Sequence, residues 1–170
     1  MAINPAAQAA QVAASVYGAV VTGGSKTLPV STTGHIFTVS TGRVVVTSLT
    51  GVVHTVIQSQ ATTLSVGNTP TGGSASTASF CATADLDGVA AGVSVAVPQA
   101  AASALMVGTA NGTLLWNTTS GAQGVGVASG GLLLVPAGTI DVTTVATSTG
   151  AIIWTVTYVP YDVGAYVTAL

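Results

Sequence analysis

Charged side chains are nearly absent from this chain of 170 residues. Only 4% of the residues are charged, and glutamate does not occur at all, whereas about a quarter of an ordinary soluble domain is charged. The charged residues are Lys26, Arg43, Asp85, Asp87, Asp141 and Asp162. A monomer in bulk water normally carries a mixed charged surface that keeps it soluble and unassociated. The composition therefore raises the question of what covers the surface of this protein.

Basic residues are scarcest of all, and this excludes two classes of partner. Two basic side chains and a formal net charge of −2 cannot supply the contacts that a nucleic-acid backbone or an anionic membrane surface requires. Residues 89–108 are uncharged over nearly a spanning length, but Ala, Gly, Ser and the internal Pro98 make a poor transmembrane helix. The N-terminus has no positively charged signal-peptide region. We expect a protein made in the cytoplasm, with no nucleic-acid partner and no membrane partner.

Cysteine and recognisable catalytic motifs are also lacking. Cys81 is the single cysteine, so no internal disulfide can form, and we expect a buried, inert thiol. No Gly-x-Ser-x-Gly nucleophile motif and no poised acid/base pair occur in the sequence. We therefore expect a protein that is not an enzyme, with no catalytic residues and no cofactor.

Two short patterns suggest a metal site, and neither is complete. The stretch Asp85-Leu86-Asp87-Gly88 resembles the opening of a calcium-binding loop, but the later oxygen ligands and the closing glutamate are missing. A hairpin turn is the simpler interpretation. His35 and His54 lie in separate predicted strands, and two imidazoles do not complete a tetrahedral site. A ring of one histidine from each of three subunits remains an alternative, but we expect no metal.

What the chain does contain is valine, threonine, serine and glycine in short alternating segments from Gly18 onward. Such segments, with turn signals between them, predict an all-β domain over residues 18–170, either a β-sandwich or a jelly-roll-like domain. The expected strands are 35–40, 43–49, 52–57, 61–66, 77–84, 93–97, 104–108, 113–116, 131–135, 139–145, 151–159 and 164–168. Gly51 is expected in a turn, and residues 67–76 are expected to form a loop.

The first 17 residues differ from the rest. "PAAQAAQVAASVY" follows Asn4, a suitable N-cap, and opens with Pro5 at the first helical position. Its apolar side chains are too few for a core helix. Residues 1–17 are therefore predicted to form a short N-terminal helical arm that docks on another surface.

The stretch "GAIIWTVTYVPYDVGAYV" contains the residues that we expect at an interface. By the alternation of a strand, Trp154 and Tyr158 lie on one face and Ile153 and Val159 on the other. One face must pack in the core of the subunit, and the other should meet a second sheet or a neighbouring subunit. The predicted interface residues are Ile153, Val159, Trp154, Tyr158 and Arg43. Arg43 is further expected to pair with Asp141, within or between subunits.

Three stretches resemble a family of small structural proteins of tailed bacteriophages. They are "TGRVVVTSLTGVVHTVIQSQATTLSV", "CATADLDG" and "VPAGTIDVTTVATSTGAIIWTVTYVPYDVGAYV", and the resemblance covers about residues 41 to 168 with an interruption near 67–76. It implies a component of the virion, encoded among capsid and tail genes, and it supplies no catalytic residues.

Composition and resemblance together favour a role in virion assembly. We expect a capsid decoration or cement protein on the head shell, built as a homotrimer and bound to the major capsid protein or to other virion proteins. A tail or fibre component is one alternative. A host-binding or carbohydrate-binding adhesion module is another, with Trp116 or Trp154 as the platform for a sugar. The expected localisation is the virion, assembled in the cytoplasm of the host.

Overall fold

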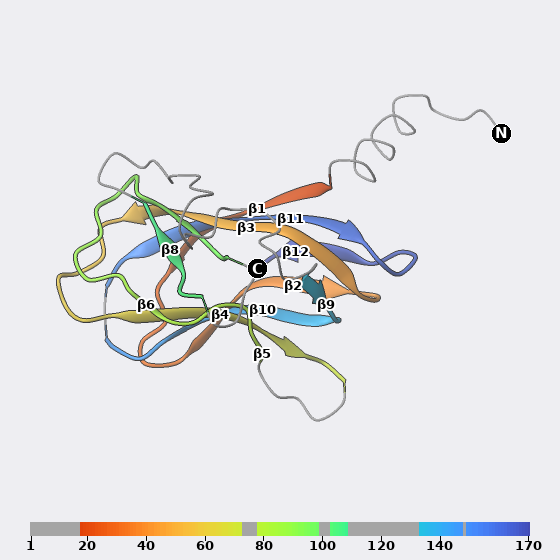
Figure 1. The fold of residues 1–170 in the computed structure, drawn as a ribbon, viewed down its shortest axis with the longest axis horizontal. Helices are drawn as coiled ribbons and strands as arrows, with labels where there is room; N and C mark the ends of the chain where they lie inside the picture. The colour runs from red at the N-terminus through yellow and green to blue at the C-terminus, as the bar shows by residue number, and fades with distance from the viewer. Residues whose placement is uncertain (1–17, 73–77, 99–102, 109–132, 148) are drawn as a thin grey trace.

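Figure 1 shows the computed structural model of the chain, which describes residues 18–72, 78–98, 103–108, 133–147 and 149–170. The predicted helical arm over 1–17, the predicted strand 113–116 and Trp116 lie outside the described residues. Every regular element within the described ranges is a β-strand, and all strand pairs in the two sheets are antiparallel. The prediction of an all-β domain is confirmed. Within the same ranges, no helix has the length and apolarity needed to cross a membrane.

The strands form two sheets, which we name sheet A and sheet B. The order across sheet A is β1 (Ala19–Thr27), β11 (Ala151–Pro160), β3 (Val44–Thr55), β7 (Ser94–Ala96) and β8 (Met106–Val107), with β9 (Leu133–Val135) also paired to β3. The order across sheet B is β12 (Tyr166–Ala169), β2 (Thr33–Ser40), β10 (Gly138–Thr144), β4 (Thr63–Pro70) and β5 (Ala78–Ser79), with β6 (Ala84–Asp85) also paired to β4. The chain passes repeatedly from one sheet to the other, and the connections from β2 to β3 and from β11 to β12 are two of these crossings.

The two sheets pack face to face as the layers of a β-sandwich (Figure 1). Alternation along each strand places one set of side chains in the core, because successive side chains point to opposite sides of a sheet. On β11 the inward set consists of Ile152, Trp154, Val156 and Tyr158, all of them buried. Full burial of one large apolar side chain stabilises a fold by roughly 1.5–3 kcal/mol. The core between the sheets is thus the main stabilising feature of the domain.

Strand β1 was not among the predicted strands, and its sequence explains why. Gly23 and Gly24 interrupt the alternation of apolar and polar side chains in the middle of the strand. The pairing of β1 with β11 shifts register between Thr22 and Ser25, so the glycine pair forms a β-bulge. A bulge adds a residue without ending the strand, and a strict period of two does not detect such a strand.

The predictions for Gly51 and for residues 67–76 also differ from the structure. Gly51 lies inside β3, opposite Trp154, and not in a turn. A Cβ atom at Gly51 would lie 2.7 Å from Cγ2 of Ile152 and 3.0 Å from Cε3 of Trp154. The glycine therefore leaves the space that these two core side chains occupy. The predicted loop 67–76 is wrong in its first part, because residues 67–70 continue β4.

Replacement of Gly51 by alanine is expected to destabilise the domain by about 1–3 kcal/mol, because the added methyl group overpacks the core beside Trp154. Chemical denaturation followed by tryptophan fluorescence measures the change. Gly24→Ala is the matched control, since a Cβ atom at Gly24 meets nothing within 4 Å. An equal loss of stability in both variants would contradict the packing explanation.

Candidate functional site

The outer face of sheet A, turned away from the core, contains the predicted interface residues Ile153 and Val159. Val159 lies opposite Val45, which in turn lies opposite Leu134, and Ile153 lies opposite Val52. We name these five side chains the aliphatic face. Val52 is 44% exposed and Leu134 is 42% exposed, and the other three are partly buried. The sandwich thus presents aliphatic groups from three strands on one side of a sheet.

Threonines lie between the two ends of the aliphatic face. The hydroxyl groups of Thr22 and Thr155 are 3.0 Å apart across β1 and β11. The hydroxyl of Thr47 donates to the backbone carbonyl of Thr157 over 3.1 Å. These hydroxyl groups are partnered within the sheet and carry no charge. The outer face of sheet A therefore has little electrostatic cost of desolvation.

Two of the predicted interface residues belong to the core of the subunit. Trp154 is only 2% exposed and Tyr158 only 6% exposed, and both point between the sheets. A second molecule cannot reach either ring, so their assignment to an interface is wrong. For the same reason Trp154 cannot serve as a sugar platform. Ile153 and Val159, on the opposite face of β11, remain the candidates for contact with a partner.

Arg43, the fifth predicted interface residue, forms a clasp with Asp162. Its backbone N–H and its Nε donate to Oδ2 of Asp162 over 2.8 and 2.9 Å, and its Nη2 donates to Oδ1 over 2.8 Å. The guanidinium carbon also lies 4.6 Å from the centre of the Tyr161 ring. Arg43 lies between β2 and β3 and Asp162 lies between β11 and β12, so the clasp joins two of the connections that cross between the sheets.

The clasp corrects the expected pairing of Arg43 with Asp141. The hydrogen bonds from Arg43 lower the pKa of Asp162 from 3.8 to about 2, and the same side-chain bond raises the pKa of Arg43. Asp141 pairs instead with His35. The two pairs lie in different parts of the sandwich, because Asp141 belongs to β10 in sheet B.

His35, Asp141 and Thr69 form a second polar cluster, which sequence reasoning missed. Oδ1 of Asp141 lies 2.6 Å from Nδ1 of His35, and its Oδ2 accepts a 2.6 Å hydrogen bond from the Thr69 hydroxyl. The Asp141 side chain is fully buried, whereas the His35 side chain is 56% exposed. The cluster therefore presents an oriented imidazole on the surface of sheet B.

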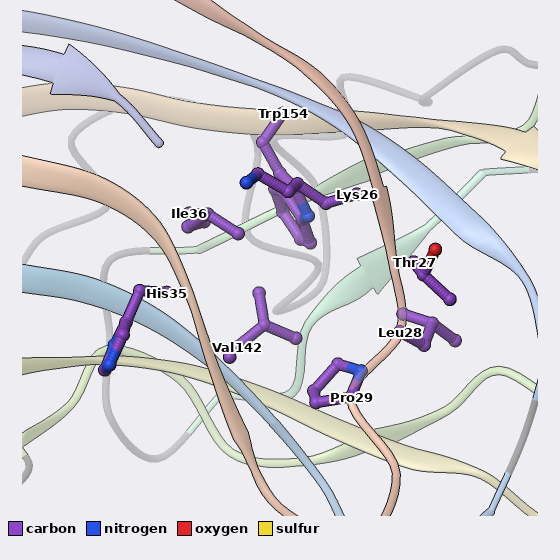
Figure 2. Close-up of a pocket in the computed structure, with 9 residues that line it drawn as sticks. Lys26, Thr27, Leu28, Pro29, His35, Ile36, Val142 and Trp154 are labelled. Atoms are coloured by element: carbon purple, nitrogen blue, oxygen red, sulfur yellow. The ribbon is translucent and has the colours of Figure 1, made fainter.

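A small cavity lies near this cluster, between the two sheets. Lys26, Ile36, Val142 and Trp154 are among the residues that line it (Figure 2). Its volume is about 40 Å³, which accommodates water molecules but not a drug-sized ligand. Figure 2 shows the His35 ring turned away from Lys26 and Trp154. His35 is also among the residues that line the cavity, and its side chain is 56% exposed.

The calcium-like stretch forms a turn. Oδ1 of Asp85 accepts hydrogen bonds from the backbone N–H groups of Thr62, over 2.9 Å, and of Asp87, over 3.1 Å. Gly88 follows with a φ of 63°. In the part of the chain that the structure describes, no three histidine, cysteine, aspartate or glutamate side chains are grouped as metal ligands. The carboxylate that would open a calcium loop is used to hold the turn.

Comparison of the chain with protein-family models, with curated proteins and with solved structures finds no match. The candidate sites are therefore defined by their own geometry. They are the aliphatic face of sheet A, the clasp between Arg43 and Asp162, and the cluster of His35, Asp141 and Thr69.

The clasp predicts a specific pH dependence of stability. The pKa of Asp162 is lowered in the folded state. The ionised carboxylate therefore adds to the free energy of unfolding above the unfolded pKa of about 4, and this stabilisation is lost as the pH falls through about 2. Asp162→Asn should therefore lower the melting temperature near neutral pH, by no more than about 4 °C because the pair is exposed. The difference from the wild-type protein should shrink towards pH 2.

Thermal denaturation followed by circular dichroism over this pH range provides the measurement. Asp87→Asn is the matched control, because it removes another exposed carboxylate that is outside the clasp. A difference between Asp162→Asn and wild type that stays constant down to pH 2 would show that the ionised carboxylate is not what stabilises the crossings.

Proposed function

We propose that this protein is a non-enzymatic structural component of a virion, and specifically a decoration or cement protein on the head shell of a tailed phage. In this proposal it assembles as a homotrimer and binds the major capsid protein. The localisation is the virion, after assembly in the cytoplasm of the host.

The aliphatic face of sheet A is the observation that carries the proposal. Its five aliphatic side chains lie among threonines whose hydroxyl groups are already partnered. Obligate interfaces resemble a protein core cut in half, with apolar groups and few charges at their centre. The outer face of sheet A has this composition. Assembly would remove its aliphatic groups from water.

The scarcity of charge supports the same proposal. Arg43 and Asp162 neutralise each other, and Asp141 is buried against His35. A subunit that is permanently assembled in a capsid shell needs few charges for solubility, because neighbouring proteins cover much of its surface. The resemblance of residues 41 to 168 to small phage structural proteins adds independent support for a place in the virion.

The oligomeric state of the purified protein tests the proposal. We expect a trimer at micromolar concentration, measured by light scattering. Ile153→Asp or Val159→Asp should dissociate or aggregate it, because each places a charge on the aliphatic face. Val163→Asp is the matched control, since Val163 is fully exposed in the turn after β11 and lies off this face. A stable 16.4 kDa monomer, unchanged by any of these substitutions, would contradict assembly through sheet A.

The number of copies per virion separates the decoration role from the alternative of a tail or fibre component. A decoration protein should be present in hundreds of copies, because it repeats over the shell. Densitometry of purified particles, with the major capsid protein as the internal standard, measures this number. A handful of copies would place the protein at the tail or at a fibre tip and would contradict the decoration role.

A further inference from the structure

Lys26, the only lysine of the chain, is turned toward the core by the β-bulge in β1. The pairing of β1 with β11 shifts register between Thr22 and Ser25, so β1 contains an extra residue there. An extra residue changes the side of the sheet that the following side chains face. Lys26 therefore lies opposite Ile152, which is fully buried between the sheets, and Lys26 is itself partly buried. A cation thus points inward at the edge of the sandwich.

The indole N–H of Trp154 is a buried donor that faces the same edge. The Cε3 side of the ring lies beside Gly51 of β3, where an added Cβ atom would be 3.0 Å from Cε3. Nε1 is on the opposite side of an indole, and β1 and β3 flank β11 on opposite sides. The N–H is therefore directed toward β1, which carries Lys26. Trp154 is 2% exposed, and no acceptor among the described residues is hydrogen-bonded to its Nε1.

Lys26 and Trp154 both line the small cavity between the sheets (Figure 2). Ile36 and Val142 form apolar parts of its wall. Figure 2 shows the Thr27 hydroxyl turned away from Trp154, as is the imidazole described above. An ammonium and an indole N–H donate hydrogen bonds and accept none. The polar side chains that face this cavity therefore supply donors and one positive charge.

We propose that this cavity binds one small monovalent anion, such as chloride, between the ammonium of Lys26 and the indole N–H of Trp154. A buried donor requires an acceptor, and within the described ranges Lys26 pairs with no carboxylate. A water molecule accepts from the N–H but leaves the ammonium without a counter-charge. The volume of about 40 Å³ accommodates a particle of about the size of water and excludes the larger sulfate ion.

The anion would attach an outer strand of sheet A to the core. Lys26 belongs to β1, whereas Trp154 lies on β11 between the two sheets. A ligand that binds only the folded state stabilises that state. The whole site lies within one subunit, so this inference goes beyond the proposed function and does not depend on assembly.

The fluorescence of Trp154 tests the site, in a Trp116→Phe background that leaves Trp154 as the only tryptophan. Bromide is the probe, because a heavy halide in contact with an indole quenches its emission. Sodium bromide replaces sodium sulfate at constant ionic strength. We expect quenching that saturates, since a side chain that is 2% exposed is closed to collisions from solvent. Chloride quenches weakly, so chloride added as a competitor should restore the emission.

Two variants of this parent protein identify the cation. Lys26→Met removes the charge and retains the length of the side chain. It should raise the bromide concentration for half-maximal quenching at least about 10-fold, because the anion loses its charged partner. Lys26→Met combined with Val163→Lys is the matched control, which restores the net charge at a fully exposed position outside the cavity. The double variant should bind bromide as weakly as Lys26→Met.

Circular dichroism establishes that each variant is folded. The proposal is overturned if bromide quenching is absent or rises linearly with concentration, which is the result for a cavity that holds water alone. It is also overturned if chloride does not restore the emission, if Lys26→Met is quenched like its parent, or if Val163→Lys restores binding. The titrations with bromide and chloride use the protein that retains Lys26, so they decide the question even where Lys26→Met does not fold.

Discussion

The packing of Trp154 against Gly51 determines which side chains this domain shows to its surroundings. The two residues lie opposite each other on β11 and β3, and the indole fills space that a side chain at position 51 would need. Ile36 and Val142 from sheet B line the same small cavity as Trp154, so both layers meet around this ring. A slip of one residue in this pairing would turn the indole outward and reverse both faces of β11. The position of the aliphatic face on the outside therefore depends on this contact.

The strands with regular alternation could be predicted from the sequence, and those shaped by glycine could not. From Ile152 to Val159 of β11 the burial follows a period of two, as valine, isoleucine and threonine at alternating positions predict. Gly51 looks like a turn in the sequence, but its missing side chain is a packing requirement that only the neighbouring strands reveal. The bulge at Gly23 and Gly24 hides β1 in the same way. The alternation of residues along one strand predicts that strand, but it does not predict which side chains of neighbouring strands pack against it.

The polar clusters could not be predicted because the fold brings together residues that are distant in sequence. Arg43 and Asp162 are 119 residues apart, and His35 and Asp141 are 106 apart. Composition shows only that charges are rare. The structure shows how they are used: Asp162 joins two of the connections between the sheets through Arg43, Asp141 pairs with His35, and Asp85 holds a turn. Three of the four carboxylates accept hydrogen bonds from the protein itself, and that of Asp141 is also fully buried.

The bulge in β1 has a further consequence for a protein with so few charges. β1 is an outer strand of sheet A with Lys26 as its one charged residue, and a straight outer strand with so little charge is a template for fibril growth. At the bulge, a Cβ atom on Gly23 would lie 3.8 Å from Cβ of Ala169 in sheet B. The strand thus bends onto the other layer, and its ladder of free backbone groups is broken. Open-ended growth of a fibril through this edge is therefore disfavoured.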